Sequence, residues 1–233
     1  MEQVRVCVFD AYGTLFDVAA AARALGRQPG REAFAAIWPQ VAADWRAKQL
    51  QYSWLRAITG EHCDFWQLTQ DGLDWALERA GEADPGLRAA LLELYWRLPA
   101  YPEVPAMLRR LKQAGRATAI LSNGSPGMLA AAVESAGLGA DLDAVLSVEE
   151  VGVFKPARAV YDLVGKRFSC APSEVLLVSS NGWDVAGAAS HGFRTLWVNR
   201  AGEPVDRLPG RPDHEAADLA GVPDLVGVSR CGM

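Results

Sequence analysis

Five short apolar runs, separated by helical segments, constrain the fold of this chain more than any other feature of its sequence. Valine is frequent in these runs, which span residues 4–9, 117–121, 144–148, 174–178 and 194–198. Strands that are covered by helices on both faces of a parallel sheet are apolar along their whole length. Strands that alternate with helices therefore predict an α/β fold, with a doubly wound and mostly parallel, Rossmann-like sheet.

The segments between several of these runs have helical character and end at glycine, a common residue just beyond a helix. These segments are 104–114, 127–136 and 183–190, and they lead to Gly115, Gly137 and Gly192. The stretch 17–97 differs, because it contains six of the eight tryptophans and shows consecutive helical patterns without a convincing strand. We therefore expect a catalytic core of residues 1–16 and 98–233, and a helical cap domain of residues 17–97 inserted after the first strand.

Composition narrows the class of protein. The 233 residues are 50% hydrophobic, which suits a globular chain with a substantial core. A net charge of -5 and a pI of about 5.3 give no bulk support for nucleic-acid binding. The sequence shows no secretory leader and no apolar run of membrane length, so we expect a cytoplasmic protein without membrane contact. Cys7, Cys63, Cys170 and Cys231 are scattered, which favours free thiols over a zinc site.

Polar residues follow four of the apolar runs. These clusters are Asp-Ala-Tyr-Gly-Thr at 10–14, Ser-Asn-Gly-Ser-Pro at 122–126, Phe-Lys-Pro at 154–156 and Ser-Ser-Asn-Gly-Trp-Asp at 179–184. In an open parallel sheet, ligands bind beyond the carboxyl ends of the strands. Folding should therefore bring two carboxylates, one lysine and several hydroxyls and amides together, a combination more specific than any one of the motifs.

These four clusters resemble the haloacid dehalogenase superfamily and, within it, the L-2-haloacid dehalogenases. The segment WRAKQLQYSWLR at 45–56 is similar to the cap signature of that subfamily, and the resemblance extends from Val4 to about Leu225. It implies hydrolytic dehalogenation of short-chain L-2-haloalkanoic acids to D-2-hydroxy acids, with inversion at C2. It also implies a homodimer, with a small 2-haloacid substrate and a halide product as ligands.

The resemblance assigns Asp10 as the nucleophile that forms a covalent ester with the substrate. It implies that Lys155 stabilises the charge of Asp10 and that Thr14 positions this carboxylate. Ser179, Asn181 and Asp184 would orient Lys155 and the water that hydrolyses the ester.

The same resemblance assigns the residues that bind substrate. Ser122 and the backbone N–H groups of Ala11 and Tyr12 would hold the substrate carboxylate. Arg46 and Asn123 would cradle the departing halide, where charge develops in the transition state. The remaining candidates are an active-site tyrosine and the apolar wall around the alkyl group, namely Tyr161, Leu50, Phe65 and Trp183.

A comparison within the superfamily predicts chemistry without a metal ion or another cofactor. Its magnesium phosphatases carry a second aspartate two residues after the first, where this chain has Tyr12. They also carry acidic ligands after the fourth strand, where Ser179 and Ser180 stand here and only Asp184 remains. Magnesium prefers carboxylate oxygens, and this site is short of them.

Simpler interpretations and rival functions stay open. Taken singly, Asp10 could cap a helix, Lys155 could lie in a surface turn, Arg46 could face water, and Phe65 and Trp183 could be core residues. The rival functions are a phosphatase on the same fold, a binding protein without catalysis, and a defluorinase of the fluoroacetate type. A Ser-His-Asp hydrolase is unsupported, because no histidine lies near a serine in a nucleophile-elbow pattern.

Overall fold

A computed structural model describes residues 1 and 3–228 of the chain. Its centre is a six-stranded parallel sheet in the order β3-β2-β1-β4-β5-β6. The strands are β1 (Val6–Phe9), β2 (Ala117–Ser122), β3 (Ala144–Ser147), β4 (Val175–Ser179), β5 (Arg194–Val198) and β6 (His214–Ala216). The predicted α/β class with a doubly wound parallel sheet is confirmed.

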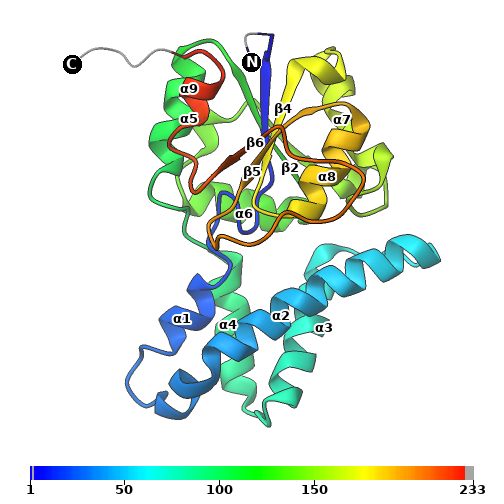
Figure 1. The fold of residues 1–233 in the computed structure, drawn as a ribbon. Helices are drawn as coiled ribbons and strands as arrows, with labels where there is room; N and C mark the ends of the chain where they lie inside the picture. Colours follow the sequence, from blue (N-terminus) through cyan, green and yellow to red (C-terminus); the bar gives the residue numbers. More distant parts are fainter. Residues whose placement is uncertain (2, 229–233) are drawn as a thin grey trace.

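Helices cover both faces of the sheet. Those that follow the inserted segment are α5 (Val104–Gln113), α6 (Pro126–Ser135), α7 (Arg158–Phe168), α8 (Gly182–His191) and α9 (Val222–Leu225), with short 3-10 turns at Gly139–Asp141, Val148–Glu150 and Pro172–Glu174. Figure 1 shows α5 and α9 on one side of the sheet and α7 and α8 on the other. The two central strands β1 and β4 are fully buried between these layers, as their apolar sequences predict.

The strand register aligns the polar clusters at one edge of the sheet. The last residue of β1, Phe9, pairs with Ile120 of β2 on one side and with Val178 of β4 on the other. The next backbone amide, that of Asp10, still donates to the Val178 carbonyl at 3.0 Å. Asp10 therefore leaves the sheet at the level where β2 ends in Ser122 and β4 ends in Ser179.

Four helices lie beyond this carboxyl edge of the sheet (Figure 1). They are α1 (Ala20–Leu25), α2 (Glu32–Thr59), α3 (Phe65–Arg79) and α4 (Pro85–Trp96). The side chains of Asp64 and Asp84 cap α3 and α4 by accepting backbone N–H groups, and α2 ends at Gly60 with a positive φ of 74°. Residues 17–97, all of which the structure describes, contain no strand, and we propose this stretch as the cap domain.

The two crossings between the sheet and these helices run side by side. Phe16 and Ala100 form an antiparallel bridge. The backbone N–H of Asp17 donates to the Pro99 carbonyl at 3.0 Å, and that of Tyr101 donates to the Leu15 carbonyl at 2.9 Å. The chain that enters the inserted segment is thus held against the chain that leaves it by backbone hydrogen bonds.

Several predicted boundaries differ from the structure by one or two residues. The run 144–148 ends one residue early as a strand, because Val148 begins a 3-10 turn. Strand β6 was not predicted from the sequence; His214–Ala216 is short and mostly exposed, so it carries no apolar pattern. Cys7, Cys63 and Cys170 are free thiols, as predicted, whereas Cys231 lies outside the described residues.

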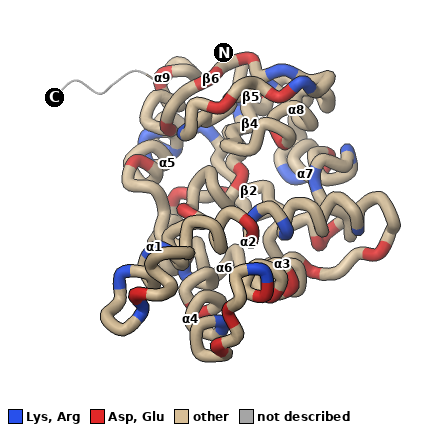
Figure 2. Tube along the Cα trace, turned by 60° about the horizontal axis from the view of Figure 1, so that its bottom comes forward, with Lys and Arg blue, Asp and Glu red and all other residues tan. Residues whose placement is uncertain are grey.

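Charged residues are spread over the whole trace. Figure 2 shows basic and acidic positions interspersed along both the helices of the inserted segment and the sheet region. Within the described part of the chain, none of the helices combines the length and the apolar character needed to cross a membrane.

Candidate active site

Asp10 is a buried carboxylate with a full set of hydrogen-bond donors. Its Oδ2 atom accepts from Thr14 Oγ1 at 3.1 Å and from Asn181 Nδ2 at 2.9 Å. Its Oδ1 atom faces the ammonium group of Lys155 at 3.3 Å. Only 9% of the side chain is exposed. The carboxylate is therefore fixed in orientation by three donors from three separate segments of the chain.

Lys155 lies between two carboxylates. Its Nζ atom donates to Asp184 Oδ2 at 2.8 Å as well as to Asp10, and both Lys155 and Asp184 are fully buried. Burial disfavours the ammonium, but the charges of Asp184 and Asp10 outweigh this effect and raise the pKa of Lys155. Lys155 is therefore a cation at neutral pH. Tyr161 completes the group by donating to Asp184 Oδ1 at 2.9 Å.

The loop after β4 supports Asp10 from the other side. The Ser179 hydroxyl accepts the backbone N–H of Asn181 at 3.1 Å, which fixes the turn that aims the Asn181 amide at Asp10. The backbone N–H of Ser180 donates to Thr14 Oγ1 at 2.8 Å. The Thr14 hydroxyl also lies 3.1 Å from Ser180 Oγ, so the loop after β4 holds the hydroxyl that contacts Asp10.

The loop after β2 forms the adjacent wall. The Ser122 hydroxyl accepts the backbone N–H of Gly124 at 3.1 Å, and Asn123 Oδ1 accepts the backbone N–H of Lys155 at 2.9 Å. Ser122 is 1% exposed and Asn123 is 6% exposed. The amide of Asn123 thus ties the loop that carries Lys155 to the end of β2.

Arg46 reaches this edge of the sheet from α2. Its Nη2 atom donates to Asn181 Oδ1 at 3.2 Å and to the Tyr12 carbonyl at 3.3 Å. The same Asn181 amide contacts Arg46 through its oxygen and Asp10 through its nitrogen. Only the Asn181 side chain therefore lies between Arg46 and the carboxylate of Asp10. The alternative interpretation of Arg46 as a helix residue that faces solvent does not agree with this position.

Tyr12 forms the apolar boundary of the site. Its ring stacks on Tyr95 with centroids 5.7 Å apart and lies 6.1 Å from the ring of Phe65. Burial, followed by the nearby Tyr95 and Asp10, raises the pKa of Tyr12 well above its usual range. The Tyr12 ring also lies close to the backbone of Gly124, where an added Cβ would be 2.8 Å from the ring atom Cε2. Tyr12 is thus a neutral aromatic group where a metal-dependent site would need a carboxylate.

The structure brings most of the predicted site residues together, but two of them, Leu50 and Trp183, lie at the margin. Ala11 is buried, and its carbonyl accepts the N–H groups of Leu15 and Phe16, so it shapes the turn after β1. Trp183 is half-buried, and its ring meets Trp54 of α2 edge-on at 5.5 Å. Leu50 is half-buried one helical turn after Arg46. Neither Leu50 nor Trp183 belongs to the hydrogen-bonded group around Asp10.

A buried polar group that was not predicted from the sequence lies behind Tyr12. Gln49 Nε2 donates to the Tyr95 hydroxyl at 3.1 Å and to Thr69 Oγ1 at 3.0 Å. Trp45 Nε1 donates to the Thr69 carbonyl at 2.7 Å, and its ring lies 4.8 Å from Tyr95. The sequence signal for this group is Gln49, which lies one helical turn after Trp45 on α2. If that face of the helix is buried, the amide of Gln49 needs a polar partner.

The residues around Asp10 do not fit a magnesium ion. No group of three or more His, Cys, Asp or Glu side chains suited to a metal ion occurs among residues 1 and 3–228. The position between Asp10 and Asp184 is taken by the ammonium group of Lys155, which supplies the positive charge there. The site therefore offers a fixed carboxylate, Asp10, beside a fixed ammonium group, Lys155.

Comparisons with known proteins identify the family of this chain. Residues 4–192 match the haloacid dehalogenase-like hydrolase family. The (S)-2-haloacid dehalogenase 1 of Pseudomonas sp. strain CBS-3 is 41% identical over 227 residues, which are 97% of this chain and 98% of that protein. A solved dehalogenase structure has a TM-score of 0.92 at 37% identity and covers 99% of this chain and 100% of its own.

A second solved structure bears on the chemistry. It is the L-2-haloacid dehalogenase of Xanthobacter autotrophicus with chloropropionic acid covalently bound. It has a TM-score of 0.84 at 38% identity and covers 97% of this chain and all of that chain. The resemblance predicted from the sequence motifs is confirmed, and the chain belongs to the haloacid dehalogenase-like hydrolase family.

Proposed function

We propose that this chain hydrolyses short-chain L-2-haloalkanoic acids to D-2-hydroxy acids through a covalent ester on Asp10, with inversion at C2. One observation carries the proposal: Asp10 is a buried carboxylate held by Thr14, Asn181 and Lys155, beside a neutral Tyr12. A nucleophile must keep an oriented, charged oxygen close to the carbon that it attacks. The covalently bound chloropropionic acid in the Xanthobacter autotrophicus relative supports the same chemistry.

In the first step, an oxygen of Asp10 attacks C2 from the side opposite the halogen. The C–X bond breaks, the halide leaves with the bonding electrons, and an ester forms. Ser122 and the backbone N–H groups of Ala11 and Tyr12 hold the substrate carboxylate. Arg46 and Asn123 stabilise the charge that develops on the halide. Tyr12, Phe65, Leu50 and Trp183 enclose the alkyl group and keep bulk water out.

In the second step, water attacks the carbonyl carbon of the Asp10 ester. The bond between that carbon and the ester oxygen attached to C2 breaks, so the product hydroxyl carries an oxygen that came from Asp10. Ser179, Asn181 and Asp184 orient Lys155 and the attacking water, while Tyr161 holds Asp184 in place. The balance is one haloacid and one water consumed, with one hydroxy acid, one halide and one proton released.

A single-turnover experiment in ¹⁸O-water tests this route. With enzyme in excess over L-2-chloropropionate, the label should enter the peptide that carries Asp10, and the first product should be largely unlabelled. If Asp10 were instead a general base for direct attack of water on C2, the label would appear in the product and not in the protein. Prior treatment with EDTA should leave turnover unchanged, because the proposed chemistry uses no metal ion.

Stereochemistry gives an independent test. The substrate carboxylate and the halide are held on different walls, at Ser122 and Arg46, so only one enantiomer presents its C–X bond in line with Asp10. We expect the L form to react and to give the D-2-hydroxy acid. Equal rates for both enantiomers, or retained configuration, would contradict the proposed arrangement.

The resemblance also motivates proposals about assembly and location. We propose a homodimer in the cytoplasm without nucleic-acid partners. Leu55 and Ile58, near the end of α2, are 51% and 81% exposed, and they offer an apolar surface for a second copy. Sedimentation equilibrium checks the dimer, and a monomer at micromolar concentration would exclude it.

A further inference from the structure

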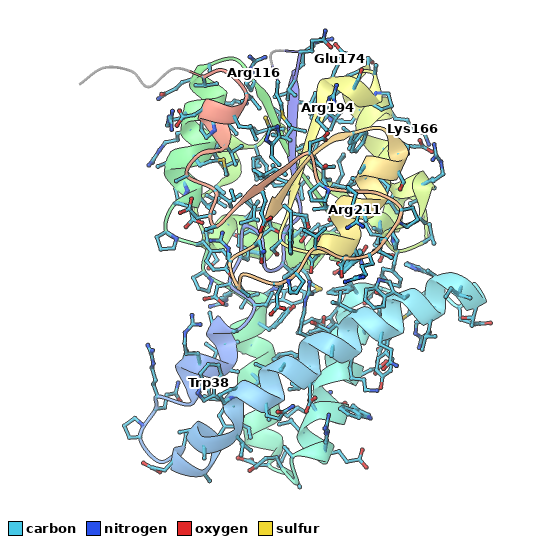
Figure 3. The ribbon with its side chains drawn as sticks, viewed as in Figure 1. Trp38, Arg116, Lys166, Glu174, Arg194 and Arg211 are labelled. Atoms are coloured by element: carbon cyan, nitrogen blue, oxygen red, sulfur yellow. The ribbon has the colours of Figure 1, made fainter. Side chains whose placement is uncertain are left out.

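A cleft of about 310 Å³ lies between α2, α4 and the first crossing. Its walls come from the first crossing, at Val18 and Ala19, and from α2, at Trp38, Pro39, Ala42 and Ala43. Figure 3 labels Trp38, which lies on α2 near α1. Aromatic rings and methyl groups dominate these walls, so the cleft is suited to an apolar group.

The floor of this cleft is shared with the candidate active site. Arg46, Gln49 and Tyr95 line it from within. On its other side, Tyr95 stacks on Tyr12, and Arg46 donates to the Asn181 amide that holds Asp10. Two side chains in succession therefore separate the cleft from the nucleophile, Arg46 and then Asn181, and Arg46 is the charged one.

Arg46 gives the cleft its preference for a ligand. Within residues 1 and 3–228, both of the hydrogen bonds made by Arg46 use Nη2, and both acceptors are neutral oxygens. No carboxylate in this described part of the chain forms an ion pair with it. A guanidinium binds carboxylates through two parallel hydrogen bonds. An apolar cleft with an unneutralised guanidinium at its floor fits a monocarboxylate with a short hydrocarbon chain.

The closed state of the site creates a need for such a position. The side chains of Asp10 and Lys155 are 9% and 1% exposed. A substrate in bulk solvent therefore has to pass other side chains before its C2 atom comes close to the Asp10 carboxylate. Movement of Arg46 alone would connect the cleft to the Asn181 amide, because these two side chains are in direct contact.

We propose that the cleft between the first crossing, α2 and α4 is an outer carboxylate-binding subsite through which substrate reaches Asp10. This inference rests in part on the proposed function, since it places the same class of acid at a second position. The carboxylate binds Arg46 from the cleft side, with its hydrocarbon chain against Trp38 and Trp45. The guanidinium of Arg46 then turns from the cleft toward Asn181, and the bound substrate moves inward with it.

The subsite has a consequence that does not depend on turnover. A carboxylic acid without a halogen and with a longer chain, such as hexanoate, should occupy the cleft and inhibit the enzyme. Ala42 lies one helical turn before Arg46 and lines the cleft, so Ala42→Trp should fill it. Ala36 lies on the same helix, is exposed and is not part of the cleft lining, so Ala36→Trp is the matched control.

The experiment measures hexanoate affinity by isothermal titration and kcat/KM by halide release for both variants and the unaltered protein. We expect Ala42→Trp to weaken hexanoate binding and to lower kcat/KM for L-2-chloropropionate by at least about tenfold each, equivalent to about 1.4 kcal/mol. Ala36→Trp should change neither by more than about twofold. Ala43→Trp, at the exposed rim of the cleft, repeats the test at a position where a large side chain is easily accommodated.

The outcomes separate the two proposals. If the unaltered protein releases no halide from any 2-haloacid, the proposed function fails, and the hexanoate titrations alone still decide the subsite. If halide is released but Ala42→Trp and Ala43→Trp both bind hexanoate as tightly as Ala36→Trp, the carboxylate binds elsewhere and the outer subsite is wrong. Equal kcat/KM values for all three variants would likewise exclude the cleft as the route of access.

Discussion

The two walls of the candidate site use opposite physical means. The sheet contributes a charged cluster of Asp10, Lys155 and Asp184, in which every member is buried and paired. The helices of the inserted segment contribute an aromatic wall of Trp45, Phe65 and Tyr95, on which the Tyr12 ring lies. The sheet therefore supplies the buried ion cluster, and the helices supply an aromatic surface and one further cation, Arg46. Each makes the other more effective, since charges act more strongly where water is absent.

The two walls should also fail differently. A buried ion cluster that loses one member leaves an uncompensated charge, which is strongly destabilising. A neutral wall that loses one polar group leaves at most one unpaired hydrogen-bonding atom, with a smaller penalty. Substitutions in the two walls can therefore be ranked in advance.

The largest effect is expected at Lys155. Lys155→Met removes the cation between Asp10 and Asp184, so halide release should fall by at least about 10³-fold, and the free energy of unfolding should fall by about 3–5 kcal/mol. Urea denaturation and a halide assay measure the two losses. Lys166→Met, at an exposed position on α7, is the control and should leave both quantities unchanged. A Lys155→Met protein that remains active would remove the charged cluster from the mechanism.

A smaller loss is expected at Arg46, the cation that the helices contribute to the site. Arg46→Ala should lower kcat by roughly 10²-fold, as loss of one charge-stabilising donor does, while the protein stays folded. Arg56→Ala, near the end of the same helix, tests whether any arginine on α2 has this effect. A change confined to thermal stability would return Arg46 to a structural role.

A substitution in the aromatic wall should change the free energy of unfolding more than the rate of halide release. Tyr95→Phe removes the hydroxyl that contacts the Gln49 amide, so the free energy of unfolding should fall by about 1–3 kcal/mol. The rate of halide release should change by no more than about threefold, because the ring and its stacking on Tyr12 remain. A rate loss as large as that of Arg46→Ala would show that the two walls are not separate in function.

The smallest effect is expected from alkaline pH. The pKa of Lys155 is raised, so its contribution to stability is fully present below the pKa of an unfolded lysine, about 10.4, and is lost only as pH rises through the higher folded value. Between neutral pH and about pH 10, kcat should therefore show no step due to Lys155. A pH–rate profile checks this. A step near pH 8 that is missing in Lys155→Met would mean that Lys155 loses its proton within the working range.

The sequence predicted the charged wall better than the aromatic one. Asp10, Ser122 and Ser179 could be placed together because parallel strands bring their carboxyl ends to one edge, whatever the details of packing. Tyr95 and Gln49 could not be placed, since their contact depends on how α2 and α4 cross, which a helical pattern leaves undefined. Leu50 and Trp183 were assigned from the motif alone, and their half-buried positions at the margin reflect that difference.

The paired crossings at Phe16 and Ala100 have an evolutionary consequence. The ends of the inserted segment are closed by backbone hydrogen bonds, whose formation requires no particular side chain. Loop-closure entropy rises only slowly with length, so a longer, shorter or unrelated insert could start and finish at the same two points. Lineages could therefore exchange the inserted segment, Arg46 included, as a module and acquire new substrate preferences, while the buried cluster of Asp10, Lys155 and Asp184 on the sheet is kept.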